Sequence, residues 1–351
     1  MSSWTDILNR PELLAMNGTM YDRSSLLKLC AEHSGDIVYN RLTELLNDQD
    51  HIEVHTSGST GEPKSIKVTK EKLLASALST IEALELQNGA NLALCISCAH
   101  IGGIMMLVRA LALGAELFCF PVSADPLKAI DNEEIDLVAL VPLQVSNGLK
   151  STAGRTRLAQ MKNVIIGGAP LEAGIARELA KFPNAIYATF GMTETLSHIA
   201  LQRLSEPVEE AFSCVGPTTL STDNEERLTI HARHLSDEPI VTNDAVELIS
   251  ETKFIWKGRL DHVINSGGIK LYPEQLEKKL SDRISERFFF ASLPDPQLGR
   301  ALILCIEGSE RHIEIQDLLD KYEQPKSIRF MQRFVEAANG KIDRSASIDQ
   351  L

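Results

Sequence analysis

The sequence predicts an α/β fold with a large N-terminal domain and a small C-terminal α+β domain. The chain has 351 residues, of which 44% are hydrophobic, so it is long enough for one large domain and a smaller one. Between about residues 90 and 190, short apolar segments alternate with segments of helical periodicity, which is typical of a mostly parallel sheet covered by helices. Beyond about residue 215 the pattern changes to short alternating strands.

The region before the alternating pattern predicts short helices and one pair of strands. Apolar residues recur at helical spacing in 24–31 and 37–46. Apolar and polar residues alternate at 52–54 and again at 66–68, which predicts two strands joined by a loop. Thr69 is a suitable N-cap for the helix expected after the second strand, because its hydroxyl can accept a backbone N–H of the first turn.

The alternating region is expected to form the parallel sheet and to carry a ligand site. Strands are expected at 92–97, 116–120, 135–141, 164–166 and 185–190, and helices at 101–113 and 171–181. Ligands bind beyond the carboxyl ends of the strands in open parallel sheets. The segments 100–103, 167–170 and 191–194 each follow an expected strand, so we expect them to share one edge of the sheet.

The last third of the chain is expected to hold the short-strand region, a hinge and the small domain. Strands are expected at 228–232, 240–242, 245–248, 253–256, 288–293 and 301–306, and helices from Pro273 to 280 and at 315–322. The predicted domains are 1–257 and 262–351, joined by a mobile hinge at 258–261.

Composition excludes several classes of protein. The chain has 35 basic and 48 acidic residues, a formal net charge of −13, which argues against a nucleic-acid partner. The longest apolar run, 101–115, contains Arg109 and is too short to span a bilayer, and the N-terminus shows no signal peptide. Cys95 and Cys98 form a C-x-x-C without a second pair, so we expect buried free thiols in a cytoplasmic protein. The oligomeric state stays open.

A cluster of hydroxyl residues and glycines, followed by a lysine, lies between the first two expected strands. Its members are Thr56, Ser57, Gly58, Ser59, Thr60, Gly61 and Lys64. Glycines let a backbone approach a ligand closely, and successive N–H groups can form a concave anion site. We interpret the stretch as a phosphate cradle. It is not a P-loop, because Pro63 replaces the second glycine, and a surface loop can have the same composition.

This string resembles the phosphate loop of the adenylate-forming superfamily, which contains acyl-CoA synthetases, luciferases and nonribosomal adenylation domains. Other motifs of that family follow in the same order. Phe190-Gly191-Met192-Thr193-Glu194 is similar to a signature whose aromatic ring stacks on adenine, whose threonine contacts the α-phosphate and whose glutamate holds Mg²⁺. Gly167-Gly168-Ala169 resembles the loop on the adenine side, where small residues let the base lie against the backbone.

Two later motifs of the family concern the ribose and the hinge. Thr242-Asn243-Asp244 resembles a Thr-Gly-Asp turn whose aspartate binds the ribose hydroxyls. Asn243 replaces the usual glycine, and because asparagine tolerates left-handed φ we expect the turn to be kept. Gly258-Arg259-Leu260-Asp261 resembles the hinge motif, which implies that Arg259 contacts the ribose and that Asp261 is the pivot.

Three resemblances concern the acid and the thiol. Gly267-Gly268-Ile269-Lys270 is similar to the loop that lines the path of coenzyme A, and Gly340-Lys341 to the pair whose lysine reaches the carboxylate and the α-phosphate during adenylation. His100 stands where the family borders the acyl pocket and guards the entry of the thiol. From the residues alone, a histidine at such a turn is also well explained as a hydrogen-bonded structural residue.

The resemblance implies an ATP-dependent acid–CoA ligase that uses ATP, Mg²⁺ and coenzyme A on a small carboxylic acid. The strings at 100–103 and 191–200 look most like the o-succinylbenzoate–CoA ligases of menaquinone biosynthesis, with Thr195, Ser197 and His198 as candidate donors to a dicarboxylate. Another small acyl- or aryl-CoA ligase, or an adenylation domain that loads a carrier protein, remains an alternative. The retained motif residues argue against a non-catalytic relic.

Overall fold

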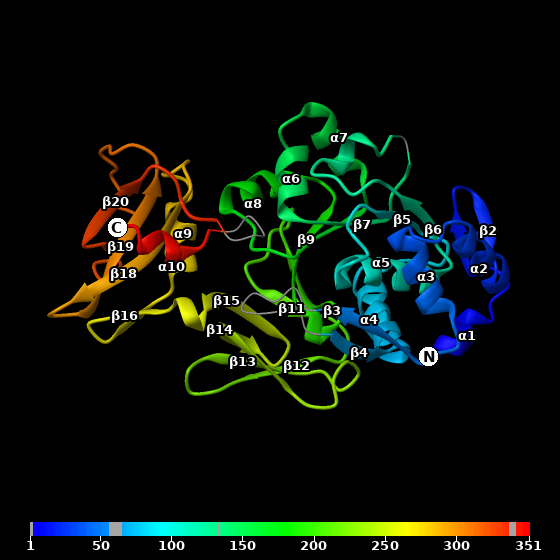
Figure 1. The fold of residues 1–351 in the computed structure, drawn as a ribbon. Helices are drawn as coiled ribbons and strands as arrows, with labels where there is room; N and C mark the ends of the chain where they lie inside the picture. The colour runs from blue at the N-terminus through cyan, green and yellow to red at the C-terminus, as the bar shows by residue number, and fades with distance from the viewer. Residues whose placement is uncertain (1–2, 56–64, 132, 337–341) are drawn as a thin grey trace.

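The computed structural model describes residues 3–55, 65–131, 133–336 and 342–351 (Figure 1). Within these residues, thirteen strands form one twisted mixed sheet. Its spatial order is β12 (Thr219–Thr222), β13 (Arg227–His231), β14 (Ile240–Ser250), β15 (Lys253–Arg259), β11 (Phe212–Cys214), β10 (His198–Arg203), β9 (Ala185–Gly191), β8 (Asn163–Ile166), β7 (Leu137–Leu140), β5 (Asn91–Leu94), β6 (Glu116–Cys119), β1 (Leu14–Met16) and β2 (Thr19–Tyr21).

The run of neighbours from β9 to β1 is parallel, and the remaining strands pair antiparallel. The expected α/β fold with a parallel centre and a short-strand region is therefore confirmed. β1 and β2 were not expected; this hairpin adds to the edge of the parallel run beside β6.

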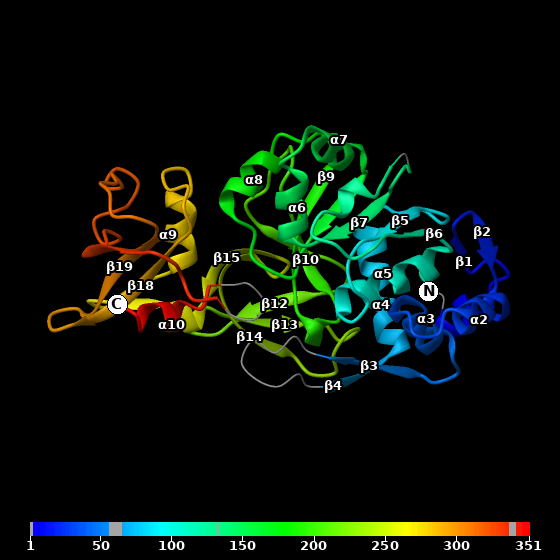
Figure 2. The same ribbon diagram turned by 45° about the horizontal axis from the view of Figure 1, so that its top comes forward.

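Helices cover both faces of the parallel strands. One face packs against α4 (Lys70–Ala83) and α5 (Ile101–Leu113), with α1 (Trp4–Leu8), α2 (Arg23–Glu32) and α3 (Ile37–Leu46) beyond them. The other face packs against η1 (Pro126–Lys128), α6 (Pro142–Gly148), α7 (Thr152–Gln160) and α8 (Ala173–Leu179). Figures 1 and 2 show α6, α7 and α8 together on one side of the sheet. The strand side chains alternate between the two cores: Leu92 and Leu94 face the first, and Ala93 faces the second.

Several local predictions are confirmed residue by residue. Thr69 accepts a hydrogen bond from the backbone N–H of Lys72 and caps α4. Helix α5 spans the expected 101–113. The expected strand pair is the antiparallel sheet of β3 (His51–His55) and β4 (Ser65–Thr69), and residues 56–64 between them lie outside the described residues.

The residues from Ile264 onward build apolar clusters of their own. Their elements are β16 (Ile264–Ser266), β17 (Ile269–Leu271), α9 (Pro273–Leu280), β18 (Phe288–Asp295), β19 (Gly299–Glu307), β20 (Ser327–Met331) and α10 (Arg344–Ile348). They lie together beyond β15 in Figures 1 and 2. The short turn η3 (Leu260–His262) connects β15 to them.

The structure corrects the predictions for two segments. Residues 315–322 form turns rather than a helix, because the side-chain amide of Gln324 takes the carbonyls of Gln316 and Leu319 that a helix would use. The two strands expected at 240–242 and 245–248 are one strand, β14, because β13 and β15 pair with it on both sides. Asn243 has no left-handed φ, so the predicted turn is absent.

The described residues contain no helix with the length and hydropathy needed to cross a bilayer. Their six cysteines are all free thiols, and Cys95 and Cys98 are both buried, as expected.

Candidate active site

The glycine-containing segments after β8 and β9 lie side by side at the carboxyl edge of the sheet. β8 and β9 are parallel neighbours, and Gly167 and Gly191 stand at their ends. Gly168 adopts φ +83, which favours glycine, and both it and Ala169 are exposed. The structure therefore brings these predicted site segments together, with open backbone available to a flat ligand.

The turn that carries Glu194 is held by close backbone packing. A Cβ on Gly191 would lie 2.5 Å from the Cα of His198 and closer still to the carbonyl oxygen of Ser197, so only glycine fits where β9 turns back into β10. Leu196 ends the short helix η2 (Thr193–Thr195) with φ +62, a strained value for leucine. Glu194 itself is exposed, with its carboxylate available to a cation.

The predicted adenine-stacking ring, Phe190, belongs to an aromatic cluster. Its ring meets Phe254 edge-on at 5.1 Å and Phe212 at 5.8 Å, centroid to centroid. These contacts tie β9 to β11 and β15, and Phe190 stays half-buried. Its neighbours fix the ring in place, which limits how it can meet a base.

The predicted ribose residues lie on two adjacent antiparallel strands. Asp244 on β14 is opposite Arg259 on β15. Asp244 is buried, and the indole N–H of Trp256 donates to its Oδ1 at 2.9 Å. Arg259 instead donates to the carboxylate of Asp261, at 3.2 and 3.4 Å. Arg259 and Asp261 are thus paired with each other at the predicted hinge.

A buried arginine joins the predicted donors Ser197 and His198 in a polar cluster, and the sequence did not identify this arginine as a site residue. Arg109 on α5 is 1% exposed and donates to Thr80 Oγ1 at 3.1 Å and to Ser197 Oγ at 2.8 Å. It forms no ion pair with any described carboxylate, and its Nε has no described partner. Burial lowers the pKa of the guanidinium to about 10, so it is charged at neutral pH.

His198 completes this cluster and is uncharged. Its Nε2 shares a 3.0 Å hydrogen bond with Thr80 Oγ1. Burial, together with the charge of Arg109, holds the pKa of His198 well below its ordinary value. The guanidinium of Arg109 on α5 therefore links α4 and the β9–β10 turn, and it is the one positive charge in this cluster.

The segment 100–103 follows β5, which belongs to the same parallel run as β8 and β9, so it lies at the expected edge of the sheet. His100 is exposed at the N-cap position of α5 and makes no capping hydrogen bond. Gly267, Gly268 and Lys270 are exposed on the β16–β17 hairpin. Of the other predicted site residues, Thr56, Ser57, Gly58, Ser59, Thr60, Gly61, Lys64 and Lys341 lie outside the described residues.

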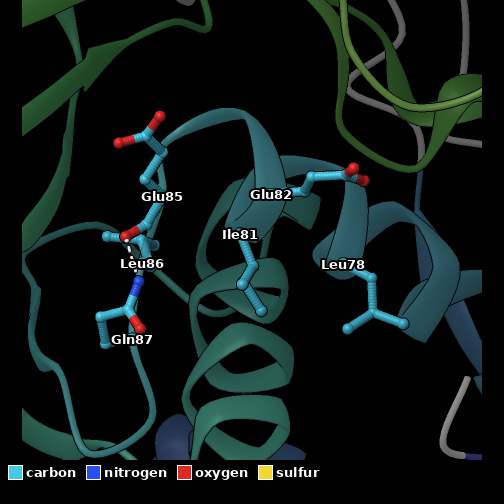
Figure 3. A pocket seen from close by; sticks show the side chains of 6 residues that line it. All are labelled: Leu78, Ile81, Glu82, Glu85, Leu86 and Gln87. Atoms are coloured by element: carbon cyan, nitrogen blue, oxygen red, sulfur yellow. Dashed lines mark hydrogen bonds between the residues drawn. The ribbon is translucent and has the colours of Figure 1, made fainter.

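A separate surface hollow of about 520 Å³ lies at the end of α4 (Figure 3). It is lined by Leu78, Ile81, Glu82, Glu85, Leu86 and Gln87. None of these is a predicted site residue, and the side chain of Gln87 donates to the local carbonyl of Glu85. We assign it no part in the site.

Comparison with known proteins identifies the family. Residues 33–225, more than half of the chain, match the family model described as AMP-binding enzyme. The chain belongs to this adenylate-forming family. An AMP-forming acyl-CoA synthetase/AMP-acid ligase II-like protein from Dyadobacter fermentans is 33% identical, with a TM-score of 0.64, over 92% of this chain and 97% of that one. The family resemblance expected from the motifs is confirmed, and the coarse activity is that of an AMP-forming acid–CoA ligase.

Several more distant relatives are named as ligases of the same acid, o-succinylbenzoate. The 2-succinylbenzoate–CoA ligase of Bacillus cereus strain Q1 is 22% identical over 327 residues, which is 83% of this chain and 68% of the relative. The corresponding enzyme of Lactococcus lactis strain IL1403 is 24% identical over 83% of this chain and 69% of the relative. The o-succinylbenzoate coenzyme A synthetase of Bacillus subtilis, in complex with ATP and magnesium ion, shares the fold with a TM-score of 0.77 at 15% identity, over 99% and 100% of the two chains.

Proposed function

We propose that this family member converts o-succinylbenzoate to o-succinylbenzoyl-CoA, with release of AMP and pyrophosphate. The observation that carries the choice of acid is Arg109, a charged group almost fully buried with no ion-pair partner among the described residues. Burying an unpaired charge costs several kcal/mol, on the order of the whole gain from a few apolar contacts. A substrate that supplies the missing negative charge would offset this free-energy cost.

The second carboxylate of a dicarboxylate substrate is the partner we assign to this charge. Ser197 is half-buried, and its hydroxyl oxygen already accepts from Arg109. The same hydroxyl lies 3.4 Å from Nδ1 of His198, which is longer than an ordinary O–H···N hydrogen bond. The Ser197 proton therefore turns from that ring nitrogen to the substrate carboxylate in this proposal, in a hydrogen bond strengthened by the guanidinium of Arg109. The neutral state of His198 leaves the cluster with one net positive charge, which matches one carboxylate.

The nucleotide is proposed to bind across the carboxyl edge, with the roles implied by the motifs. Gly168 and Ala169 are exposed and Gly167 is half-buried, and we assign the base to this segment. Thr193, which follows β9, is assigned to the α-phosphate. The exposed carboxylate of Glu194 fits a Mg²⁺ ion, which takes few protein carboxylates and keeps phosphate oxygens as ligands. Mg²⁺ would neutralise phosphate charge during attack by the acid.

The experiment for the acid is a pyrophosphate-release assay across a matched panel. o-Succinylbenzoate, benzoate, 2-alkylbenzoates of the same length and simple fatty acids are compared by kcat/KM, with free coenzyme A and without it. We expect o-succinylbenzoate to be preferred and its thioester to accumulate with free coenzyme A. A higher kcat/KM for benzoate or a fatty acid refutes the assignment. Pyrophosphate release without thioester identifies a carrier-loading enzyme instead.

The small domain is proposed to begin after a hinge at 258–261 and to swing between two arrangements. Contacts on two sides hold the present arrangement. At the N-cap of α9, the hydroxyl of Tyr272 donates to Glu226 Oε2 at 2.5 Å, and Lys257 donates to Glu226 Oε1 at 3.1 Å. At the other end of α9, Arg177 on α8 donates to the carbonyl of Ser281 at 3.2 Å. Gly258, with φ +145, lies against the carboxylate of Glu274 on α9, where a Cβ would collide.

Limited trypsin digestion tests this hinge. We expect cleavage near Arg259 in the free protein and slower cleavage with a non-hydrolysable acyl-adenylate analogue, because the ligand favours one closed arrangement. Without ligand, trypsin should cleave the Tyr272→Phe variant faster than the unmutated protein, because the variant lacks the hydrogen bond to Glu226. A cutting rate that responds to neither the analogue nor this substitution argues for a rigid connection.

A further inference from the structure

The carboxylate of Asp244 is buried but only partly satisfied. Asp244 is 6% exposed, and its Oδ1 accepts from the indole N–H of Trp256 at 2.9 Å. No other donor from the described residues reaches this carboxylate, and none of their cations lies within 4 Å of it. A carboxylate offers about four acceptor positions, and buried carboxylates are normally paired. Oδ2 therefore keeps accepting capacity for a ligand that brings its own donors.

A β-bulge places Trp256 on the same face as Asp244. In the ladder between β14 and β15, Asp244 is opposite Arg259 and Ala245 is opposite Gly258, but Val246 is opposite Trp256. Lys257 is thus the extra residue. In a regular ladder Lys257 would occupy the position beside Asp244, so the bulge substitutes a neutral indole donor for a lysine charge.

Arg259, the nearest arginine, does not donate to the carboxylate of Asp244. Arg259 is directly opposite Asp244, yet its guanidinium donates to both oxygens of Asp261. The backbone N–H of Asp244 donates to Thr242 Oγ1 at 3.1 Å, which fixes the main chain but not the carboxylate. The orientation of the carboxylate therefore rests on one side chain, the indole of Trp256.

We propose that Trp256 is a positioning residue that turns the carboxylate of Asp244 so that Oδ2 accepts from the ribose hydroxyls of the nucleotide. This inference rests on the proposed nucleotide site and adds to it the residue that sets its preference for a ribonucleotide. A neutral donor suits the role, because a lysine or arginine at this place would satisfy both oxygens and compete with the ribose.

The test compares ATP with 2′-deoxy-ATP and 3′-deoxy-ATP in the adenylation reaction. The readout is the ratio of kcat/KM for ATP to that for each analogue, which does not depend on the fraction of folded enzyme. Trp256→Phe removes the N–H and keeps a ring, and Trp256→Tyr restores a donor as a hydroxyl. Asp244→Asn is the positive control. Trp4→Phe is the matched negative control, because the indole of Trp4 donates to Leu45 O at 3.3 Å in the N-terminal layer.

We expect Trp256→Phe to lower the ratio about tenfold or more, chiefly through KM, because a hydrogen bond to a charged group typically contributes that much. Trp256→Tyr should recover part of the ratio, and Trp4→Phe should leave it unchanged. If Asp244→Asn lowers the ratio but Trp256→Phe does not, the indole only fills space and the inference is wrong. If the unmutated protein shows no preference for ATP and Asp244→Asn changes nothing, the inference fails together with the proposed nucleotide site.

Discussion

Lys341→Ala is expected to slow adenylate formation by about a hundredfold or more while the thioester step persists. The resemblance of Gly340-Lys341 to the family motif implies that this lysine approaches the substrate carboxylate and the α-phosphate of ATP, two negative groups that must meet. Removing one positioned charge from such a step typically raises its activation free energy by on the order of 3 kcal/mol. Lys341 itself lies outside the described residues. The residues on either side of it are anchored among the C-terminal elements: Glu336 and Ile342 form an isolated β-bridge, and Arg344 donates to Glu277 Oε2 at 2.9 Å.

The two half-reactions are measured separately on the same variant. Pyrophosphate release in the absence of coenzyme A reports adenylation, and synthetic acyl-adenylate with coenzyme A reports thioester formation. Lys321→Ala, an exposed lysine of the same C-terminal region, is the matched control and should leave both rates unchanged. Equal loss of both half-reactions in Lys341→Ala contradicts a role confined to adenylation.

Arg109→Met is expected to reduce the preference for a dicarboxylate about tenfold to a hundredfold without destabilising the fold. The loss follows because hydrogen bonds that involve a charged group contribute roughly 1.5–3 kcal/mol. Methionine has a similar length and removes an unpaired buried charge, so the free energy of unfolding should be unchanged or higher. Thr80 keeps its hydrogen bond to His198 in this variant.

The measurement combines urea unfolding with kcat/KM for o-succinylbenzoate and for a 2-alkylbenzoate that lacks the second carboxylate. Arg109→Lys, which keeps the charge, should retain much more of the preference than Arg109→Met. A variant that loses activity equally on both acids, with a lower free energy of unfolding, shows instead that Arg109 is a structural group between α4 and the β9–β10 turn.

Local signals explain which elements could be predicted. Thr69 and Pro273 mark the starts of α4 and α9 through capping chemistry that depends only on neighbouring residues. The continuity of β14 could not be predicted in this way, because the Thr242-Asn243-Asp244 string favours a turn until β13 and β15 pair with it on both sides.

Some residues of the candidate site can likewise be predicted from local sequence, whereas others depend on how strands pair. The segments at Gly167 and Glu194 follow from the rule that ligands gather at the carboxyl ends of parallel strands. Arg109 interrupts an apolar run in the sequence, and a single cation in an otherwise apolar helix is the signal that identifies it as a candidate site residue. Trp256 could not be assigned beforehand, since the bulge that brings it beside Asp244 depends on the pairing of two strands.

Product identification in a single turnover tests the central claim most directly. The purified protein, in excess over o-succinylbenzoate, is mixed with ATP and Mg²⁺, and coenzyme A is added only after the first reaction is complete. Mass spectrometry should detect o-succinylbenzoyl-adenylate and one equivalent of pyrophosphate before the addition, and o-succinylbenzoyl-CoA with AMP after it. Formation of ADP and phosphate, or an adenylate that coenzyme A does not consume, would contradict the assignment as an acid–CoA ligase.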